Sequence, residues 1–199
     1  MAGIDWSQSS PAEPEDMKRA TYEDVLNAPS NKVAEILDGE LFLSPRPAPK
    51  HAVASSEIGM AIGNPFHRGA GGPGGWWILD EPELHFGEQV LVPDLAGWRR
   101  ERLPAIPDEA FFTLAPDWVC EVLSPSTERI DRSRKLRIYA EAGVQHAWLV
   151  KPTDRTVEVL RADLLGGGDE LLDRAGNEAP CEDGDNQGDQ EDLDQRERD

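Results

Sequence analysis

The sequence predicts an α/β domain, in which helices flank a mixed β-sheet and an extra N-terminal β-hairpin precedes it. Three observations support this fold class. Short apolar segments of β-favouring residues alternate with two longer helical patterns, the element order of an α/β sandwich. Asp38-Gly39 lies between two alternating apolar segments, as in a hairpin with a type I′ turn. A chain of 199 residues, 38% of them hydrophobic, is also long enough to bury a core.

One folded domain is expected over residues 21–162, between two polar segments. Residues 1–20 are rich in Pro, Glu and Ser, whereas residues 163–199 consist largely of Gly, Asp, Glu, Asn and Gln. Such compositions bury too little apolar surface to offset the entropy lost on ordering. We therefore expect a disordered leader and a disordered acidic tail.

The first half of the chain predicts a capped short helix, a hairpin, a core helix and two strands, in that order: residues 21–26, 33–43, 51–66, 76–79 and 83–86. Val53, Ile58 and Ile62 are expected on the apolar face of the core helix. The glycine-rich segment 69–75 lacks the Gly-Lys-Ser/Thr of a phosphate-binding loop, so we expect a flexible link there.

The second half predicts two strands, a long helix and a closing hairpin: residues 89–98, 118–123, 127–142, and 147–150 with 156–160. Residues 99–115 contain two prolines, Pro104 and Pro107, and are expected to form a loop. Gly143 is expected to end the long helix at its C′ position.

Charged residues within two of these apolar elements need a physical explanation. Glu121 interrupts the apolar strand 118–123, and a glutamate is almost never fully buried unless it is paired or bound to a metal. On the helix that follows, Lys135 shares an inward-facing stripe with Ile138 and Tyr139. We therefore expect Glu121 and Lys135 to share a polar pocket, because each makes burial of the other less costly.

Asp94 is a second acid inside an apolar segment, residues 89–98. Carboxylates of Asp94 and Glu121 on neighbouring strands would repel each other unless a divalent cation or a lysine lay between them. Metal-assisted hydrolysis of a phosphodiester uses that arrangement.

A set of segments in a fixed order carries a resemblance to a known family: residues 35–41, 44–45, His51, 92–94, 119–126, Lys135 with Tyr139, 142–144 and 148–150. This pattern resembles the Uma-type, restriction-endonuclease-like branch of the PD-(D/E)XK nuclease superfamily, over roughly residues 22–161. The chain departs from the superfamily at Leu123, where the acid-x-lysine pattern has lysine. In this branch the lysine has migrated to the following helix, which Lys135 fits.

The resemblance implies a restriction-endonuclease-like core and a Mg²⁺- or Mn²⁺-dependent endonuclease that hydrolyses nucleic acid, with DNA favoured over RNA. It assigns Asp94, Glu121 and Lys135 as catalytic residues. Asp94, Glu121 and the carbonyl of Val122 would be the metal ligands. The extra candidates for the metal site are Glu35, Glu40 and His51.

Each of these residues also has a structural interpretation. Asp94 could cap a strand end, and Glu121 with Lys135 could form a purely structural ion pair. His51 could be an exposed residue at a helix start, and Glu35 and Glu40 ordinary hairpin residues. The alternative function is accordingly a catalytically inactive nuclease-fold protein that acts as a binding or regulatory module.

The net charge of −19 opposes a generic role in binding nucleic acid. From residue 162 onward the chain has 14 acidic residues and 3 arginines, so about −11 of the charge belongs to the last 38 residues and about −8 to the rest. A local basic patch matters more than the sum. Such a patch, or merely a solvated helix face, is offered by four arginines: Arg129, Arg132, Arg134 and Arg137.

The cysteines and the hydropathy pattern predict the cellular setting. Cys120 lies in an expected buried strand and Cys181 in the polar tail, which does not indicate a disulfide framework. No segment has the length of a membrane span or the apolar core of a signal peptide. We expect a cytoplasmic protein without a membrane partner, and homo-oligomer formation is left open.

Overall fold

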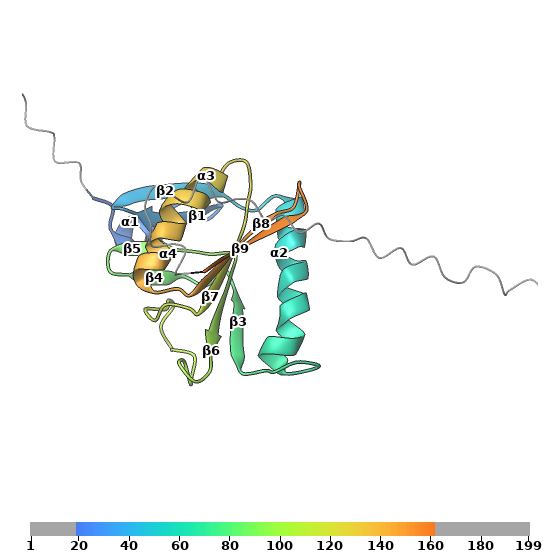
Figure 1. Ribbon diagram of the computed structural model, residues 1–199. Coiled ribbons are helices and arrows are strands. Elements are labelled where there is room, and N and C mark those ends of the chain that lie inside the picture. The colour runs from blue at the N-terminus through green and yellow to red at the C-terminus, as the bar shows by residue number, and fades with distance from the viewer. Residues whose placement is uncertain (1–18, 162–199) are drawn as a thin grey trace, which may run out of the picture.

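The computed structural model describes residues 19–161, which form two β-sheets with helices packed against them (Figure 1). The expected acidic tail and Cys181 lie outside the described residues, as does the expected leader apart from Arg19 and Ala20. The predicted fold class, a mixed α/β domain with an N-terminal hairpin, is confirmed. No helix within residues 19–161 is long and apolar enough to cross a lipid bilayer.

The larger sheet is mixed and has the strand order β3-β6-β7-β8-β9. β7 and β8 are parallel, and the other neighbours are antiparallel. Its strands are β3 (Trp76–Asp80), β6 (Leu95–Arg99), β7 (Trp118–Val122), β8 (His146–Lys151) and β9 (Thr156–Arg161). The closing hairpin β8–β9 was predicted from the sequence and is confirmed.

The smaller sheet is antiparallel and has the order β2-β1-β5-β4. Its strands are β1 (Lys32–Leu37), β2 (Glu40–Pro45), β4 (Leu84–Phe86) and β5 (Gln89–Leu91). The turn between β1 and β2 has φ of 59° at Asp38 and 82° at Gly39. Positive φ at both central residues is what a type I′ turn requires, so the predicted hairpin is confirmed.

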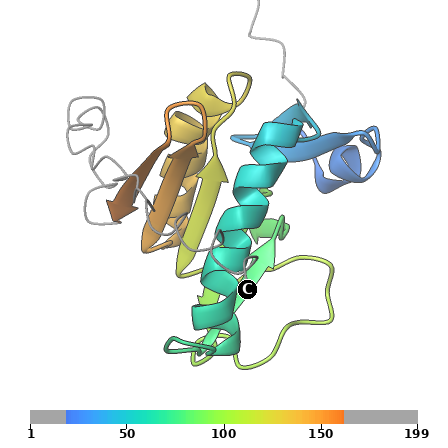
Figure 2. The same cartoon turned by 90° about the vertical axis from the view of Figure 1, so that its right-hand side faces the viewer.

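Helices cover both faces of the larger sheet (Figure 2). One face is crossed by α2 (Pro49–Ile62) and its π-helical extension η1 (Gly63–Arg68). The other face is covered by a continuous helical segment made of α3 (Glu128–Ile130), the π-helical turn η2 (Asp131–Lys135) and α4 (Leu136–Ala142). The short helix α1 (Tyr22–Leu26) opens with a capping box in which Asp24 accepts a hydrogen bond from the Thr21 N–H at 2.8 Å.

The alternation of side chains along β7 decides which residues face which helix. Trp118, Cys120 and Val122 belong to the apolar cluster beneath α2, whereas Val119 and Leu123 belong to the cluster beneath α4. Glu121 lies between Val119 and Leu123 on the α4 side.

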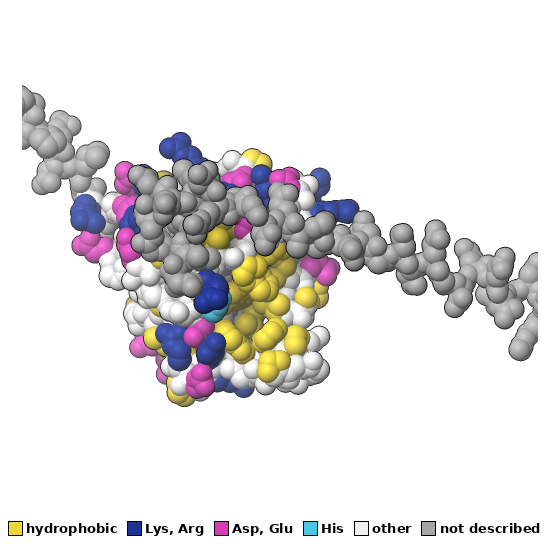
Figure 3. All heavy atoms as spheres, viewed as in Figure 1, with side chains coloured by type: hydrophobic (Ala, Val, Ile, Leu, Met, Phe, Trp, Pro, Cys, Tyr) yellow, Lys and Arg dark blue, Asp and Glu magenta, His cyan; other side chains and the backbone are white. Residues whose placement is uncertain are grey.

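The contact of α2 with the sheet differs in part from the prediction. It runs through Ala54, Ile58 and Ile62, which are four residues apart. Val53 is 60% exposed, so its expected place on the apolar face was wrong. Figure 3 shows hydrophobic side chains gathered on one face of the molecule, and the exposed large hydrophobic residues of α2 and β9 include Val53, Met60, Val157 and Val159.

The predicted single strand 89–98 is in fact two strands in two sheets. β5 ends at Leu91 in the smaller sheet, and β6 begins at Leu95 in the larger one. Pro93 lies between them and has no N–H to donate to a continuing ladder. The chain therefore changes sheet at this point, which places Asp94 at the junction of the two sheets.

Candidate active site

Lys135 is the centre of a buried cluster of charges. Its Nζ lies 2.8 Å from Glu121 Oε1, 3.0 Å from Glu35 Oε1 and 3.7 Å from Asp131 Oδ1. All four residues are buried, and the lysine side chain is only 3% exposed. The contact expected between Glu121 and Lys135 is present, but it belongs to a larger cluster than a single pair.

Three separate elements supply this cluster. Glu35 comes from β1 in the smaller sheet, Glu121 from β7 in the larger sheet, and both Asp131 and Lys135 from η2. Residues four apart on a helical segment lie on the same face, so Asp131 and Lys135 both point toward the sheets. The cluster therefore joins the two sheets to the helical segment.

Hydrogen bonds fix two of the carboxylates. The hydroxyl of Tyr139, one turn after Lys135, donates to Glu121 Oε1 at 2.6 Å. The backbone N–H of Val92 donates to Glu35 Oε1 at 2.8 Å, which ties Glu35 to the sheet junction. Glu121 and Glu35 are thus held in place by protein groups as well as by the lysine.

Asp94 lies beside this cluster, at the end of β7. Its Oδ2 accepts a hydrogen bond from the N–H of Val122 at 2.7 Å, and its Oδ1 lies 3.3 Å from His51 Nε2. His51 Nδ1 is buried and has no hydrogen-bond partner in the part of the chain that the structure describes. His51 is therefore not the exposed helix-start residue of the structural interpretation.

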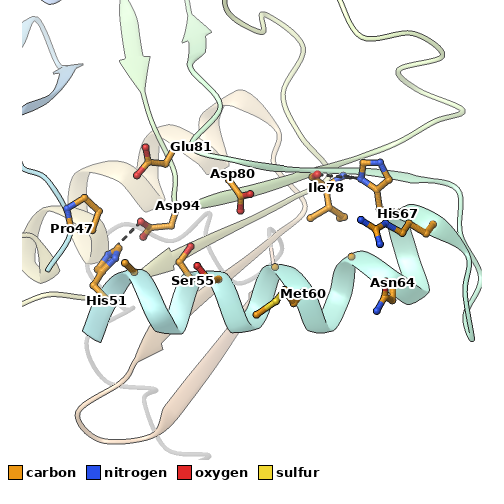
Figure 4. Close-up of a pocket in the computed structure, with 15 residues that line it drawn as sticks. Pro47, His51, Ser55, Met60, Asn64, His67, Ile78, Asp80, Glu81 and Asp94 are labelled. Carbon is orange, nitrogen blue, oxygen red and sulfur yellow. Dashed lines mark hydrogen bonds and ion pairs between the residues drawn. The ribbon is translucent and has the colours of Figure 1, made fainter. Parts of the chain in front are cut away.

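A pocket of about 420 Å³ opens onto these residues, and its lining includes Glu35, His51, Asp94, Glu121, Asp131 and Lys135. A longer groove adjoins it and runs between α2 and β3 (Figure 4). His51, Glu81 and Asp94 line both hollows. The charged cluster is thus reachable from the surface near Asp94, although most of its side chains are buried.

Burial and charge together determine the protonation of the cluster. Burial raises the pKa of Glu121 well above its usual range, and the ammonium of Lys135 opposes this only in part. Burial likewise raises the pKa of Asp131. Burial works against the charge of Lys135, yet Glu121 and Glu35 raise its pKa well above the usual value. The lysine is therefore cationic, and the acidic side chains around it outnumber it.

A hydrogen bond to Asp94 is the main cause that raises the pKa of His51, against the opposing effect of burial. Protonation of this imidazole would add a second positive charge next to Asp94. Even then, the acidic side chains of the region outnumber the two cations, Lys135 and protonated His51; the four acids are Glu35, Asp94, Glu121 and Asp131.

The three extra candidates for the metal site, Glu35, Glu40 and His51, lie in different surroundings. Glu35 contacts Lys135 and His51 contacts Asp94. Glu40 does neither, because it lies on the surface and pairs with Arg134. The hairpin turn puts Glu35 and Glu40 on different strands, and only the inner strand β1 reaches the cluster.

Sequence reasoning missed Asp131. Its signal is its position four residues before Lys135, on the same helical stripe. Three of the arginines expected to form a basic patch are engaged in surface ion pairs, Arg132 with Glu128 and Glu158, Arg134 with Glu40, and Arg137 with Asp38 and Glu141. These five ion pairs favour the solvated helix face over a phosphate-binding patch.

The donor atoms near Asp94 suit a hard divalent cation. Within residues 19–161, no three His, Cys, Asp or Glu side chains are placed to hold an ion among themselves. Magnesium, however, needs few protein ligands and prefers carboxylate and carbonyl oxygens. Glu121 receives its protein hydrogen bond through Oε1, whereas Asp94 is held through both oxygens, Oδ2 by the Val122 N–H and Oδ1 by His51. The donor set of Asp94, Glu121 and the Val122 carbonyl therefore fits the chemistry of Mg²⁺ or Mn²⁺.

Residues 19–182 match the family model of Uma2, described as "Putative restriction endonuclease". The chain belongs to this family. The resemblance stated from the sequence is thereby confirmed. Enzymes of the restriction-endonuclease-like class generally use divalent metal ions.

A solved structure with a similar fold is described as that of "a putative nuclease belonging to DUF820 from Anabaena variabilis ATCC 29413". This chain is 26% identical to it, with a TM-score of 0.61, and the match covers 72% of this chain and 80% of the other. No curated protein matches the sequence.

Proposed function

We propose that this Uma2-family protein is an endonuclease that hydrolyses phosphodiester bonds of nucleic acid with the help of Mg²⁺ or Mn²⁺, and that its substrate is DNA. One observation carries the proposal. Three acids, Glu35, Glu121 and Asp131, lie around a single buried lysine, and a fourth, Asp94, lines the same pocket. A structural ion pair would need one acid for one base, whereas an excess of carboxylates favours an additional cation.

Asp94, Glu121 and the carbonyl of Val122 would hold the ion. When bound, a divalent cation supplies a Lewis acid for the phosphate oxygen and lowers the pKa of water toward neutrality. The hydrogen bond from the Val122 N–H fixes Asp94, and that from the Tyr139 hydroxyl fixes Glu121. Such positioning reduces the reorganisation that the site would otherwise need during the reaction.

Lys135 would stabilise negative charge that develops on the phosphate and orient the attacking water. Its neighbours keep it protonated, which argues against a role as general base. Its Nζ already lies within hydrogen-bond distance of Glu121 Oε1. This contact supports the proposal that the lysine has migrated from position 123 to the helix, as does Leu123, which is apolar and buried in the core beneath α4.

The second candidate function is a nuclease-fold binding module without catalysis. Leu123 in place of the superfamily lysine favours it, as does the charge of about −8 outside the last 38 residues, because binding of nucleic acid is dominated by phosphate neutralisation. The two functions differ in a measurable way. A binding module would hold nucleic acid without cleaving it under any metal condition.

A cleavage assay tests the proposed function. The full chain is incubated with DNA and, separately, RNA, in Mg²⁺, in Mn²⁺ and in chelator. We expect metal-dependent cleavage of DNA that falls about a hundredfold or more in Asp94→Asn, since that change removes a charge that holds the ion. Asp38→Asn makes the same chemical change in the hairpin turn and should cleave as the parent does. Cleavage by Asp94→Asn at the parent rate, or none by the parent with either ion, would refute the proposal.

A further inference from the structure

The groove between α2 and β3 is larger than the pocket at Lys135, and nothing in the proposed chemistry requires it. Its volume is about 930 Å³. Asp94 and His51 lie at one end, and His67 lies at the other, where its Nδ1 accepts the Ile78 N–H at 3.1 Å (Figure 4). At about 1.5 Å of rise per residue, the helical segment between the two histidines is about 25 Å long. That length corresponds to about seven base-pair steps of duplex DNA.

Small and polar residues of the helical segment line this groove: Ala52, Ser55, Ser56, Gly59, Gly63 and Asn64. Glycine weakens a helix relative to alanine, so two glycines on one stripe need a reason. A Cβ atom on Gly59 would meet Asp80 Oδ1 at 3.4 Å, an ordinary contact, and one on Gly63 would meet nothing within 4 Å. Packing therefore does not require glycine at either position, and the effect of both is to keep the groove wide.

Two arginines that have no carboxylate partner among the described residues lie near the end remote from Asp94, Arg68 in the lining of the groove and Arg100 beside it, bound to the His67 carbonyl. Arg68 lines the groove, is exposed, and makes no ion pair within the described residues. Arg100 donates to the carbonyl oxygens of Trp76 at 3.2 Å and His67 at 3.0 Å, and its guanidinium lies 4.0 Å from the centre of the Trp77 ring. Backbone and ring thus hold Arg100 in place without neutralising its charge.

Other arginines of this region differ from these two. Arg46 pairs with Glu81, and both Arg99 and Arg102 pair with Asp117. In a protein with a net charge of −19, uncompensated guanidinium groups at the same end of one groove favour an anionic ligand. Fixed guanidinium groups are well suited to phosphate oxygens.

We propose that this groove is the track of one strand of the nucleic-acid substrate, with its phosphates anchored by Arg68 and Arg100 at one end and its scissile bond at Asp94. The assignment of the Asp94 end rests on the proposed function. Acidic Glu81 and Asp94 lie at that end, and Asp80 lies midway along the groove opposite Gly59. A metal ion at the Asp94 end would offset the acidic charge there, whereas the arginine end needs no metal. Binding through the arginines should therefore persist in chelator.

Binding of a fluorescent 20-base-pair duplex in chelator, followed by anisotropy at several salt concentrations, tests the track. Arg68→Ala and Arg100→Ala together should weaken binding at least tenfold and reduce the slope of log K against log salt by about 2, one unit for each lost phosphate contact. Arg137→Ala, which removes the same charge from the outer face of α4, is the control and should bind as the parent does.

Gly63→Leu gives an independent test, because it fills the groove without removing a charge. It should weaken binding while the melting temperature stays at or above that of the parent. Arg68→Ala alone breaks no ion pair within residues 19–161. Gly63→Leu and Arg68→Ala, each as a single variant, therefore test the track even if the variant that lacks Arg100 folds poorly.

The inference would be overturned if Arg68→Ala and Gly63→Leu bound DNA with the affinity and salt slope of the parent. It would also be overturned if Arg137→Ala lost as much affinity as the groove variants. Metal-dependent cleavage that is indifferent to both changes would overturn the track and leave the proposed function standing. Binding in the groove without any cleavage would support the track and refute the proposed function.

Discussion

At the scale of single residues, Lys135 determines whether the buried acids can coexist. Removing one member of a buried charge cluster costs about 3–5 kcal/mol, because it leaves the opposite charges uncompensated. Lys135→Ala would leave Glu35, Glu121 and Asp131 without their shared cation. The lysine is thus a structural residue as well as a candidate catalytic one.

Lys135→Ala should abolish cleavage and lower the free energy of unfolding by about 3–5 kcal/mol at neutral pH, measured by urea denaturation. Part of the loss should return in mild acid, since the uncompensated carboxylates then take up protons. Lys151→Ala is the matched control, because Lys151 pairs with Glu128 and Asp154 at the surface and should cost at most about 1 kcal/mol. Equal stability of the Lys135→Ala variant and the parent would contradict the buried-cluster account.

The sequence revealed the site through residues that did not fit their surroundings. Glu121 in an apolar strand and Lys135 on an inward helical stripe were both visible, and their contact is present. Asp131 was missed because it stands among arginines, where an acid is expected on a solvated surface. Glu35 contacts Lys135 and Glu40 does not, a difference that hairpin position alone does not predict, because it does not say which of two neighbouring strands lies inward.

At the scale of elements, a pair of hydrogen bonds ties the hairpin β1–β2 to α4. Arg137 Nη2 donates to both carboxylate oxygens of Asp38 at 2.7 Å. These hydrogen bonds lower the pKa of Asp38 below its ordinary value of 3.8. A lowered pKa in the folded state stabilises the fold above the unfolded-state value, and this contribution is lost as the pH falls through the folded-state value.

Asp38→Asn should lower the free energy of unfolding at pH 7 by about 0.5–1 kcal/mol, a modest amount because the pair is partly exposed. Asparagine tolerates the positive φ of this turn, so the change isolates the charge. The difference between variant and parent should narrow as the pH falls below about 3.8, in urea denaturation at a series of pH values. A difference that stays constant throughout that acid range would show that the turn, and not the ion pair, is affected.

Local chemistry made some elements predictable and left others open. The Asp38-Gly39 turn and the end of α4 at Gly143, with φ of 89°, follow from the few residues that adopt positive φ. The division of residues 89–98 between two sheets depends on which partners β5 and β6 find elsewhere in the chain. The π-helical turns η1 and η2 similarly depend on packing against the sheets, and no local pattern marks them.

At the scale of the whole molecule, net charge was a poor guide to the surface near the site. The formal charge of −19 opposes nucleic-acid binding, yet acids and bases are distributed unevenly. Carboxylates gather around Lys135 and Asp94, while Arg68 lies at the far end of the groove and Arg100 lies beside that end. The local arrangement of charges, which the sequence alone does not reveal, is what favours a metal-dependent nuclease.

The thermal unfolding of the full chain with and without Mg²⁺ or Mn²⁺ tests the central claim most directly. An ion that binds only the folded state at about 100 times its Kd stabilises that state by about 2.7 kcal/mol, so the melting temperature of the parent should rise. Asp94→Asn and Glu121→Gln should lose this rise, and Asp38→Asn should keep it. A parent that melts at the same temperature with and without either ion, or an Asp94→Asn variant that shows the full rise, would contradict the assignment of a metal-binding nuclease site.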